Sequence, residues 1–497
     1  MEHDRKVIII GSGPSGAMAA YELISQGIPV VMLESGDKSP RGLLVRLAGK
    51  NLYRWKSGDG FREGDLHTSS GDPHTAWYYN FSPGGMSNDW TGAVPRFAPE
   101  DFDEGERLHE RYRWPVTYDD LVPFYEKSEH FLDITANPED VPQLLAGNVA
   151  FPQQLPKDWQ QIANHAEAIG QGLTTIPIAD GRPWMIVRRG TAFNSYAKII
   201  ALLLKSRNFT LITNAHVLRL VWSGTEKRVT SVIYHDKASH SKKQLDADAF
   251  IVTCGSLYST KLLFDSTSND FPNGLGNNHD VLGRYLHDHP KEWWSFETDK
   301  PLSILSPSAY LTRVPHAESD PLLAASWTIG YTSGKDKLKS LFGMKGNAVG
   351  VQIFGTMIPR KSFYARPHSS KKDAFGLPLL DLHIKYEEDV VNNVVKSRER
   401  LISIMEAAGY QCKIHKIIPQ LHPGHSVHYG GSVRMHESPE YGVVNGANRL
   451  HEVPNVIVSD ASSFTTGSEK NPTLTAMALS ARAANLLATD LKIGGLS

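Results

Sequence analysis

Two short apolar runs frame the first helix that the sequence predicts. Val7–Ile10 contains no polar residue, and neither does Val30–Leu33, which is followed by Glu34. Between them, apolar residues at helical spacing predict a helix over residues 17–24. Strands that are apolar on both faces are typical of parallel sheets covered by helices. We therefore expect a strand–helix–strand unit at the start of a doubly wound sheet.

The middle of the chain predicts both helices and strands. We expect a helix over residues 118–132, strands over 211–222 and 229–234 with a turn at Gly224, and a buried strand over 249–253 leading into a helix that ends near residue 263. Residues 36–89 are instead rich in Gly, Ser, Asp and Arg. They predict a long irregular segment, and segments of this kind usually form or cover a functional site.

The pattern changes again beyond residue 290. Stretches of alternating polar and apolar residues, 293–297 and 349–354 among them, predict an antiparallel sheet. Residues 387–408 repeat apolar side chains at helical spacing, and Gly409 follows, which predicts a long helix that ends there. The chain therefore contains patterns for two different kinds of sheet.

Length and composition favour two domains in a soluble protein. The chain of 497 residues is longer than one hydrophobic core usually organises, and its 40% hydrophobic and 21% charged residues are ordinary for a globular protein. The formal net charge is −1 without a long basic run, so neither nucleic acid nor an anionic membrane is an expected partner. The first apolar run is too short for a signal peptide, and no stretch approaches the roughly 20 apolar residues of a membrane helix. We expect a cytoplasmic location.

The sequence has only two cysteines, Cys254 and Cys412. Two cysteines make neither a disulfide framework nor a cysteine-rich metal site. We expect two reduced, mostly buried thiols and no metal.

The glycine-rich segment after the first strand is a candidate phosphate-binding turn. It reads Gly11-Ser12-Gly13-Pro14-Ser15-Gly16, between a predicted strand and a predicted helix. Glycines in this spacing permit a tight turn and let the backbone approach a pyrophosphate at the helix N-terminus. Glu34, at the end of the next strand, would accept hydrogen bonds from ribose hydroxyls and repel a 2′-phosphate. FAD or NAD is therefore favoured over NADP, and this motif alone leaves an NAD-dependent dehydrogenase open.

Two further clusters decide between these cofactors. Residues 83–92 read PGGMSNDWTG, and the C-terminal part of the chain contains HYGGSVRM at 428–435, NVIVSDAS at 455–462 and NPTLTAMAL at 471–479. Paired glycines let backbone lie against a planar ring. In order and spacing these clusters resemble the glucose–methanol–choline (GMC) family of flavin-dependent alcohol oxidoreductases, and among them the pyranose oxidases and bacterial glycoside 3-oxidases. The resemblance is strong over about residues 1–100, over 211–287 and over the last 70 or so.

The resemblance implies an α/β fold. A Rossmann-like FAD-binding domain of the GMC and p-hydroxybenzoate hydroxylase type would be interleaved with an α+β substrate domain that contains an antiparallel sheet. The expected FAD-binding domain comprises residues 1–104, 191–290 and 425–497, and the expected substrate-binding domain comprises residues 105–190 and 291–424.

The resemblance also implies FAD as the cofactor, held non-covalently. Fungal pyranose oxidases link their flavin through a histidine at the position occupied here by Asp89, which cannot form that bond. The residues expected to contact FAD are Gly11, Gly13, Pro14, Ser15, Gly16, Glu34, Ser35, Gly84, Gly85, Met86, Asn88, Trp90, Thr91, Gly92, Ala93, Val217, Cys254, Gly255, Asp460, Ala461, Asn471, Pro472 and Thr473.

By the same resemblance, His428 and Asn471 are the expected catalytic residues. Neutral His428 would remove the proton of a substrate hydroxyl as general base while hydride passes to flavin N5, and Asn471 would hydrogen-bond the hydroxyl oxygen. Asn471 also fits the N-cap of a helix that begins at Pro472, whose positive end would stabilise reduced flavin. The presence of both residues argues against a flavin-binding protein without catalysis.

The expected substrate is a sugar or glycoside, oxidised to a keto-sugar at a secondary ring hydroxyl on carbon 3 or carbon 2. Aromatic residues at Trp184, Trp293 and Trp294 suit stacking on a sugar, although core packing is the more common reason for such tryptophans. Oxygen, giving hydrogen peroxide, or a quinone-type acceptor would reoxidise the flavin. We expect a monomer or a dimer. A non-sugar alcohol such as choline remains the alternative substrate.

Overall fold

Strand β1 (Val7–Ile10) lies inside a six-stranded, mainly parallel sheet. The computed structural model describes residues 6–37, 66–179, 193–313, 324–330, 339–340 and 342–494. β1 pairs in parallel with β2 (Val30–Leu33) on one side and with β11 (Ala249–Val252) on the other. The sheet continues outward through β7 (Phe209–Ile212) next to β2, and through β20 (Val453–Val458) and the antiparallel β19 (Arg449–Leu450) next to β11. All four residues of β1 are buried, as their β-branched side chains predict.

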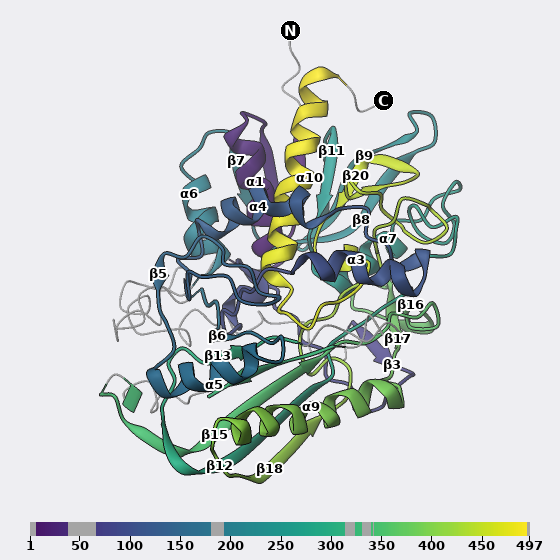
Figure 1. Ribbon diagram of the computed structural model, residues 1–497. Coiled ribbons are helices and arrows are strands. Elements are labelled where there is room, and N and C mark those ends of the chain that lie inside the picture. The colour runs from purple at the N-terminus through teal and green to yellow at the C-terminus, as the bar shows by residue number, and fades with distance from the viewer. Residues whose placement is uncertain are drawn as a thin grey trace.

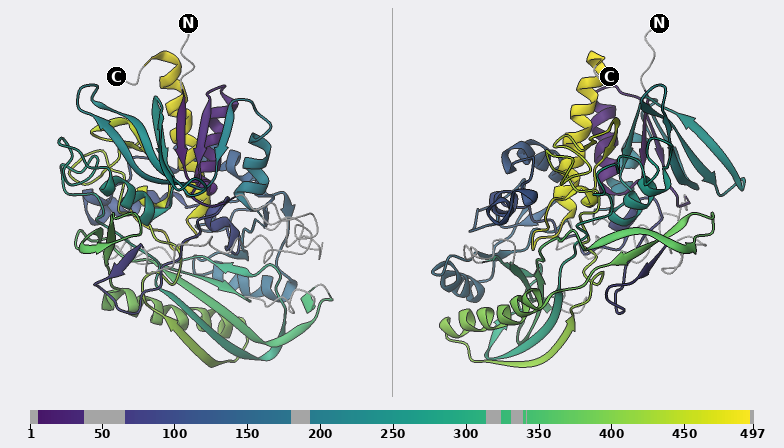
Figure 2. Two further views of the ribbon diagram at one scale, coloured as in Figure 1. Left: turned by 180° about the vertical axis from the view of Figure 1, so that it is seen from behind. Right: turned by 90° about the vertical axis from the view of Figure 1, so that its right-hand side faces the viewer.

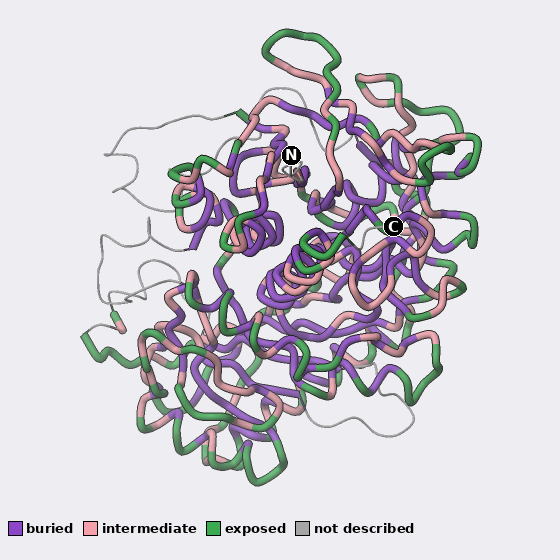
Figure 3. Tube along the Cα trace, turned by 90° about the horizontal axis from the view of Figure 1, so that it is seen from above, coloured by how far each residue is buried: buried purple, intermediate pink, exposed green. Residues whose placement is uncertain are grey.

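Helices cover this parallel sheet. α1 (Pro14–Ser25) packs along α10 (Thr473–Ile493), where the Ser480 hydroxyl donates a hydrogen bond of 2.8 Å to the Ser15 carbonyl. α4 (Tyr118–Glu129) crosses α10 on the other side, and α7 (Ser256–Asp265) follows β11. Figure 1 shows the yellow α10 running beside α1 and behind α4. In Figure 3 the buried parts of the chain (purple) lie mainly in the interior and the exposed parts (green) mainly at the periphery.

A second six-stranded sheet forms the other half of the molecule. Its strands, in spatial order, are β18 (Cys412–Gln420), β12 (Lys291–Ser303), β15 (Lys345–Gly355), β14 (Ala325–Ile329), β13 (Ala309–Leu311) and β6 (Leu173–Thr175). Every pairing between these strands is antiparallel. α5 (Lys157–Glu167) and α9 (Glu388–Ala407) cover one face, as Figures 1 and 2 show. Trp294, Phe296 and Leu401 are part of the apolar core between this face and the helices.

β18 is an edge strand of this sheet. Most of its length is exposed, including the side chains of Ile414, Ile417 and Ile418. Lys413 and Lys416 are interspersed with these isoleucines.

The remaining elements are smaller. They are α3 (Pro99–Leu108) and α6 (Ala201–Leu203), the antiparallel sheet of β8 (Ala215–Ser223), β9 (Arg228–Asp236) and β10 (Ser241–Asp246), the sheet of β3 (His67–Ser69), β16 (Tyr364–Lys372) and β17 (Pro378–His383), and the pair of β4 (Thr135–Ala136) and β5 (Phe151–Pro152). Among the residues that the structure describes, no helix is both long and apolar enough to cross a membrane.

The structure confirms the doubly wound sheet, the antiparallel sheet, the helix that ends before Gly409 and the free state of both cysteines. The prediction of one strand over residues 211–222 is wrong. Asn214 adopts a left-handed φ of 58°, which breaks the chain between β7 in the parallel sheet and β8 in the three-stranded sheet. Of the irregular segment at 36–89, residues 38–65 lie outside the described part, and the rest contains β3. The expected domain boundaries stay a prediction.

Candidate active site

The glycine-rich turn lies between the end of β1 and the start of α1. Gly11 has a φ of 102°, and a Cβ added to it would lie 2.5 Å from the Thr253 carbonyl oxygen. A Cβ on Gly16 would lie only 2.1 Å from the Gly11 carbonyl oxygen. Both positions therefore need glycine for close packing of the helix, the turn and β11. At Gly13, before Pro14 and Ser15 start the helix, an added Cβ would meet no described atom within 4 Å, so bare backbone faces open space there.

Glu34 follows β2 and is buried next to this turn. Its carboxylate accepts hydrogen bonds from the Ser12 hydroxyl at 2.5 Å, the Ser12 backbone N–H at 3.1 Å and the Gly36 N–H at 2.8 Å. The Glu34 carbonyl accepts from Ala215 N–H at 2.9 Å, which brings the start of β8, and with it Val217, to the same place. Ser35 also reaches β8, since its hydroxyl lies 2.9 Å from Nδ1 of His216.

The second glycine loop, residues 83–92, lies directly against the first. A Cβ on Gly85 would come within 3.2 Å of the Gly13 Cα, and the Gly84 N–H donates to the Ser12 hydroxyl at 3.1 Å. Gly84 and Gly85 have positive φ values, and the chain from Gly85 through Met86 to Asn88 forms one 3₁₀ turn. Two sequence segments more than 60 residues apart therefore present adjoining glycine backbone.

The polar side chains of this loop are occupied within the protein. The Asn88 amide donates to the carbonyls of Pro83 and Gly85 at 3.2 and 2.9 Å, and its oxygen accepts from Asn194 at 2.5 Å. The Trp90 indole N–H donates to the Phe193 carbonyl at 2.9 Å. Asn88 and Trp90 thus shape the loop. Thr91 is exposed, and Gly92 and Ala93 are buried.

A third group of predicted cofactor residues meets at the ends of β11 and β20. The buried Asp460 carboxylate accepts from the Gly255 N–H at 2.9 Å and from the Ser259 hydroxyl at 2.6 Å. Burial raises the pKa of Asp460, although these hydrogen bonds oppose the shift. The Ala461 carbonyl accepts from Gly431 N–H, three residues after His428. Burial also raises the pKa of the Cys254 thiol, whose Sγ lies 3.3 Å from the Ile10 carbonyl oxygen, so this cysteine is not a reactive thiolate.

These features fit a bound FAD. The carboxyl ends of the parallel strands carry two adjoining glycine turns, a carboxylate after β2, and bare backbone at Gly13 and Gly255, where an added Cβ would meet no described atom within 4 Å. Dinucleotides bind at this edge of doubly wound sheets, because backbone N–H groups and a helix N-terminus face the phosphates there.

His428 and Asn471 face one another. Nε2 of His428 lies 3.1 Å from Nδ2 of Asn471, although 43 residues separate them in the chain. Burial lowers the pKa of His428 well below its usual 6.5, and the nearby His289 and Lys291 lower it further. The ring is therefore neutral at neutral pH. Phe354 of β15 packs beside it, with ring centroids 4.9 Å apart.

Asn471 does not cap the following helix, contrary to one of its two expected roles. α10 begins at Thr473, one residue later than predicted, with Pro472 at the N-cap position and no side-chain cap. The side chain of Asn471 is turned toward His428 instead. The N-terminus of α10 nevertheless lies directly beside this pair.

Sequence reasoning missed Asp288 and His289. Both are fully or almost fully buried, and both contact the His428 segment. The Asp288 carboxylate accepts hydrogen bonds from the backbone N–H groups of Gly424 at 2.7 Å and His428 at 3.2 Å, and from the Ser426 hydroxyl. The signal in the sequence was the run His287-Asp288-His289-Pro290 just before β12, which places three titratable side chains before a proline.

A buried network of charges precedes Asn471. The Lys470 ammonium lies 2.8 Å from Asp101 of α3 and 2.8 Å from Glu469, and Arg313 lies 2.9 Å from Glu104 and 3.8 Å from Glu469. These side chains connect α3, the end of β13 and the loop before α10. Removing one partner of such a buried pair leaves an uncompensated charge, so the network holds the loop that carries Asn471.

The antiparallel sheet turns its second face toward this loop. Lys291, Trp293 and Phe354 share that face, because side chains alternate along a strand and Trp294 faces the helices. On β14, the Ser326 hydroxyl donates to the Glu469 carbonyl at 3.1 Å. Trp294 is therefore a core residue and is not available to stack on a substrate. Trp293 lies on the face of His428, and Trp184 lies outside the described residues.

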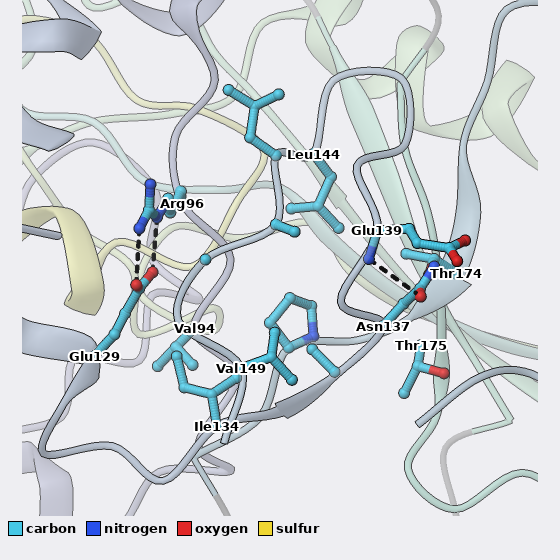
Figure 4. A pocket seen from close by; sticks show the side chains of 15 residues that line it. Val94, Arg96, Glu129, Ile134, Asn137, Glu139, Leu144, Val149, Thr174 and Thr175 are labelled. Carbon is cyan, nitrogen blue, oxygen red and sulfur yellow. Dashed lines mark hydrogen bonds and ion pairs between the residues drawn. The ribbon is translucent and has the colours of Figure 1, made fainter. Parts of the chain in front are cut away.

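The cavity in Figure 4 is separate from the His428–Asn471 pair. It is lined by residues such as Val94, Leu144 and Thr174, and its internal space is about 20 Å³. Arg96 and Glu129 form a two-pronged ion pair at one side of it, with both contacts at 2.7 Å. This space holds roughly one water molecule and is too small for a substrate.

Comparison with known protein families agrees with this geometry. Models described as GMC oxidoreductase match residues 110–291 and 367–480, which together make up more than half of the chain. A model described as FAD binding domain matches residues 4–43, which contain the first glycine turn and Glu34.

Relatives with curated names are distant but of similar length. The fructose dehydrogenase large subunit of Gluconobacter japonicus is 24% identical, with 98% of each chain covered. The 6'''-hydroxyparomomycin C oxidase of Streptomyces lividus is 26% identical over 98% of this chain and 91% of its own. The C-glycoside 3-oxidase of Microbacterium trichothecenolyticum is 22% identical over 83% of this chain and 76% of its own.

Solved structures share the fold. Pyridoxine 4-oxidase from Mesorbium loti superposes with a TM-score of 0.67 at 17% identity, covering 97% of this chain and 99% of the other. A variant of formate oxidase from Aspergillus oryzae has a TM-score of 0.66 at 15% identity, with 99% of each chain covered. With two family models, the FAD-binding model and this fold in agreement, the chain belongs to the GMC oxidoreductases, FAD-dependent enzymes that act on CH–OH groups.

Proposed function

We propose that this enzyme oxidises a secondary ring hydroxyl of a sugar or glycoside, on carbon 3 or carbon 2, to a keto-sugar. The observation that carries the proposal is the His428–Asn471 pair, which lies beside the N-terminus of α10 and packs against Phe354 on a sheet face with aromatic and polar side chains. Oxygen or a quinone-type compound takes up the electrons.

His428 is the general base of the proposed reaction. A base must be unprotonated before it can act, and burial keeps the pKa of this ring well below 6.5. A substrate hydroxyl that hydrogen-bonds Nε2 gives up its proton to this nitrogen. The proton leaves as the C–H bond of the same carbon breaks, so the ring becomes an imidazolium in a buried site.

Asn471 orients the hydroxyl. Its side-chain amide lies at hydrogen-bond distance from the same nitrogen, so a substrate hydroxyl that takes the place of this contact would meet an N–H donor and a proton acceptor together. FAD, when bound against the two glycine turns, supplies the ring that accepts hydride. The Asp89 carboxylate accepts a hydrogen bond of 2.6 Å from Asn80 and offers no group for a histidyl–flavin bond, so we propose non-covalent binding.

Two findings support a sugar-like substrate. Several relatives are named for work on sugars or aminoglycosides, among them the fructose dehydrogenase subunit and the paromamine 6'-oxidase of Streptomyces fradiae. On the sheet face beside His428, Trp293 offers an aromatic surface, and Gln352 and Thr328 on the same face offer hydrogen bonds. Aromatic faces with flanking polar groups suit a ring that has apolar C–H faces and hydroxyl edges.

Anaerobic bleaching of the flavin tests the proposal directly. The purified enzyme is mixed with free sugars, aryl glycosides and C-glycosides, and each hit is repeated with its 2-deoxy and 3-deoxy analogues as matched controls. We expect one ring-deoxy analogue to bleach no flavin, which identifies the oxidised carbon. Bleaching by choline or a simple diol, without bleaching by any sugar, would refute a sugar or glycoside as the substrate. It would still be consistent with an alcohol oxidoreductase.

The His428→Ala variant tests the catalytic role. We expect it to retain FAD and to reduce it about 10²–10⁴ times more slowly, the usual contribution of a general base. A near-normal rate per bound flavin would show that His428 only packs.

A further inference from the structure

Three polar side chains follow one another across the site. Nδ1 of His289 lies 3.1 Å from Nδ1 of His428, and Nε2 of His428 lies 3.1 Å from Nδ2 of Asn471. His289 is almost completely buried, and its Nε2 faces the 467–468 segment, where a Cβ built on Gly467 would lie 3.6 Å from it. Hydrogen bonding to the Ser468 backbone acts to raise the pKa of His289. The row therefore has a backbone group at one end and an amide at the other.

The end groups determine where the hydrogens lie. A hydrogen bond that raises the pKa of a histidine is one in which the ring donates, so the group of Ser468 that takes part is its carbonyl. Because Nδ1 of His289 faces His428 and Nε2 faces the 467–468 segment, we assign the proton of His289 to Nε2. A neutral imidazole has one N–H, which leaves a lone pair on Nδ1 of His289. The hydrogen between the two Nδ1 atoms must then belong to His428, and Nε2 of His428 is left unprotonated. The Asn471 amide presents an N–H to that nitrogen, which agrees with this assignment.

We propose that His289 is a positioning residue for the proposed reaction: by accepting the Nδ1–H of His428, it holds His428 in the tautomer whose Nε2 can take the substrate proton. The inference rests on the proposed function of His428. When the hydroxyl proton moves to Nε2, Nδ1 keeps its own proton, and no proton passes to His289. The bond between the two rings then becomes charge-assisted and stronger, which stabilises the imidazolium as it forms.

The surroundings keep both rings neutral beforehand. Burial lowers the pKa of His289 to about 3 and that of His428 well below 6.5. His289 and Lys291 lower the pKa of His428 further, His287 lowers that of His289, and Glu469 raises that of His289. Phe354 lies beside both rings, with centroids 6.1 Å from His289 and 4.9 Å from His428.

Two substitutions at His289 separate its hydrogen bond from its volume. Leu fills the space without an acceptor, whereas Asn can place Oδ1 where Nδ1 stands. We expect His289→Leu to slow flavin reduction about 10- to 100-fold, the size of one hydrogen bond to a charged group, with an unchanged dissociation constant for substrate. His289→Asn should restore the rate to within a few-fold. His67→Leu is the matched control, because His67 is also a buried, neutral histidine but contacts Tyr79 in the β3 region. It should change stability without changing the rate per bound flavin.

Nitrogen-15 NMR of histidine-labelled holoenzyme reads the tautomer without any substrate. The resonances of His428 are assigned by their loss in His428→Ala. We expect a protonated Nδ1 and an unprotonated Nε2, and in His289→Leu a rising fraction with the proton on Nε2. A wild-type His428 protonated on Nε2 would overturn the inference even if His289→Leu did not fold.

The kinetic outcomes separate a failure of the proposed function from a failure of the role of His289 alone. A normal reduction rate in His428→Ala refutes the proposed function itself. A slow His428→Ala together with a normal His289→Leu refutes only the role of His289. Equal slowing by His289→Leu and His289→Asn would also refute it, because the acceptor would then not be the property that matters.

Discussion

Replacing Asp288 should disturb the loop from Gly424 to His428 more directly than replacing any other side chain described above. Its buried carboxylate accepts from Gly424 N–H through one oxygen, and from His428 N–H and the Ser426 hydroxyl through the other. Asp288→Asn keeps the shape but replaces one of these oxygens with an NH₂ group. In either orientation of the amide, an N–H then points at a backbone N–H, and one end of the loop from Gly424 to His428 loses its acceptor.

The magnitude follows from the one buried donor that is left unsatisfied. Such a donor costs about 1–3 kcal/mol, and we expect the free energy of unfolding to fall by that amount. Burial raises the pKa of Asp288, so removing its charge offsets part of the loss and keeps the effect within this range. A misplacement of His428 by about 1 Å should slow flavin reduction about 100-fold.

Urea unfolding of the apoprotein and anaerobic reduction per bound flavin measure the two effects separately. Asp381→Asn is the matched control, because that half-buried carboxylate of β17 accepts a hydrogen bond of 3.1 Å from the exposed Ser70, away from His428. An Asp288→Asn variant within about 0.5 kcal/mol of wild type and with a normal reduction rate would refute the reasoning, since surface substitutions behave in that way.

Three further predictions concern the cofactor and the base. Gly13→Ala should leave the stability of the apoprotein unchanged, because the φ of Gly13 is −63° and no described atom lies within 4 Å of the new Cβ. It should weaken FAD binding roughly 10- to 100-fold, because the new methyl group blocks close approach of the pyrophosphate. A normal affinity for FAD would show that Gly13 is not part of the cofactor site. Acid or heat denaturation should release intact FAD into the supernatant, because Asp89 cannot form a covalent bond to the flavin as a histidine could. Flavin that stays with the precipitate would contradict non-covalent binding. The rate of flavin reduction should rise with pH and level off below pH 6.5, because only the neutral ring of His428 accepts a proton and burial lowers the pKa of this ring. A stopped-flow pH profile of this rate with a midpoint above pH 6.5 would contradict the prediction.

Elements with a strong local pattern could be predicted from the sequence. β1 and β2 begin and end where expected, because a strand buried on both faces is an uninterrupted apolar run. α9 was predictable from its helical spacing and from Gly409, whose φ of 84° suits the end of a helix. The break at Asn214 was not predictable, because neither glycine nor proline marks it and the apolar pattern continues on both sides.

The site was predictable only in part, and for a different reason. The glycine turn and Glu34 form a local motif, whereas His428 and Asn471 were identified through a family resemblance. The roles of Asp288 and His289 depend on a loop more than 130 residues further along the chain that folds onto them, which no local pattern records. Which of Trp293 and Trp294 faces the site was equally hidden, because it depends on the face that α5 and α9 cover.

The edge strand β18 has a consequence for solubility. Its outer side offers backbone groups and three exposed isoleucines, and such an edge invites another molecule to add a strand. Lys413 and Lys416 alternate with these isoleucines, and Pro419 has no N–H to donate. Two copies that met along this edge would bring ammonium groups together and would lose a backbone hydrogen bond at the proline. The same strand that completes the substrate-side sheet therefore resists aggregation, and replacing both lysines with threonine should make the protein precipitate at lower concentration.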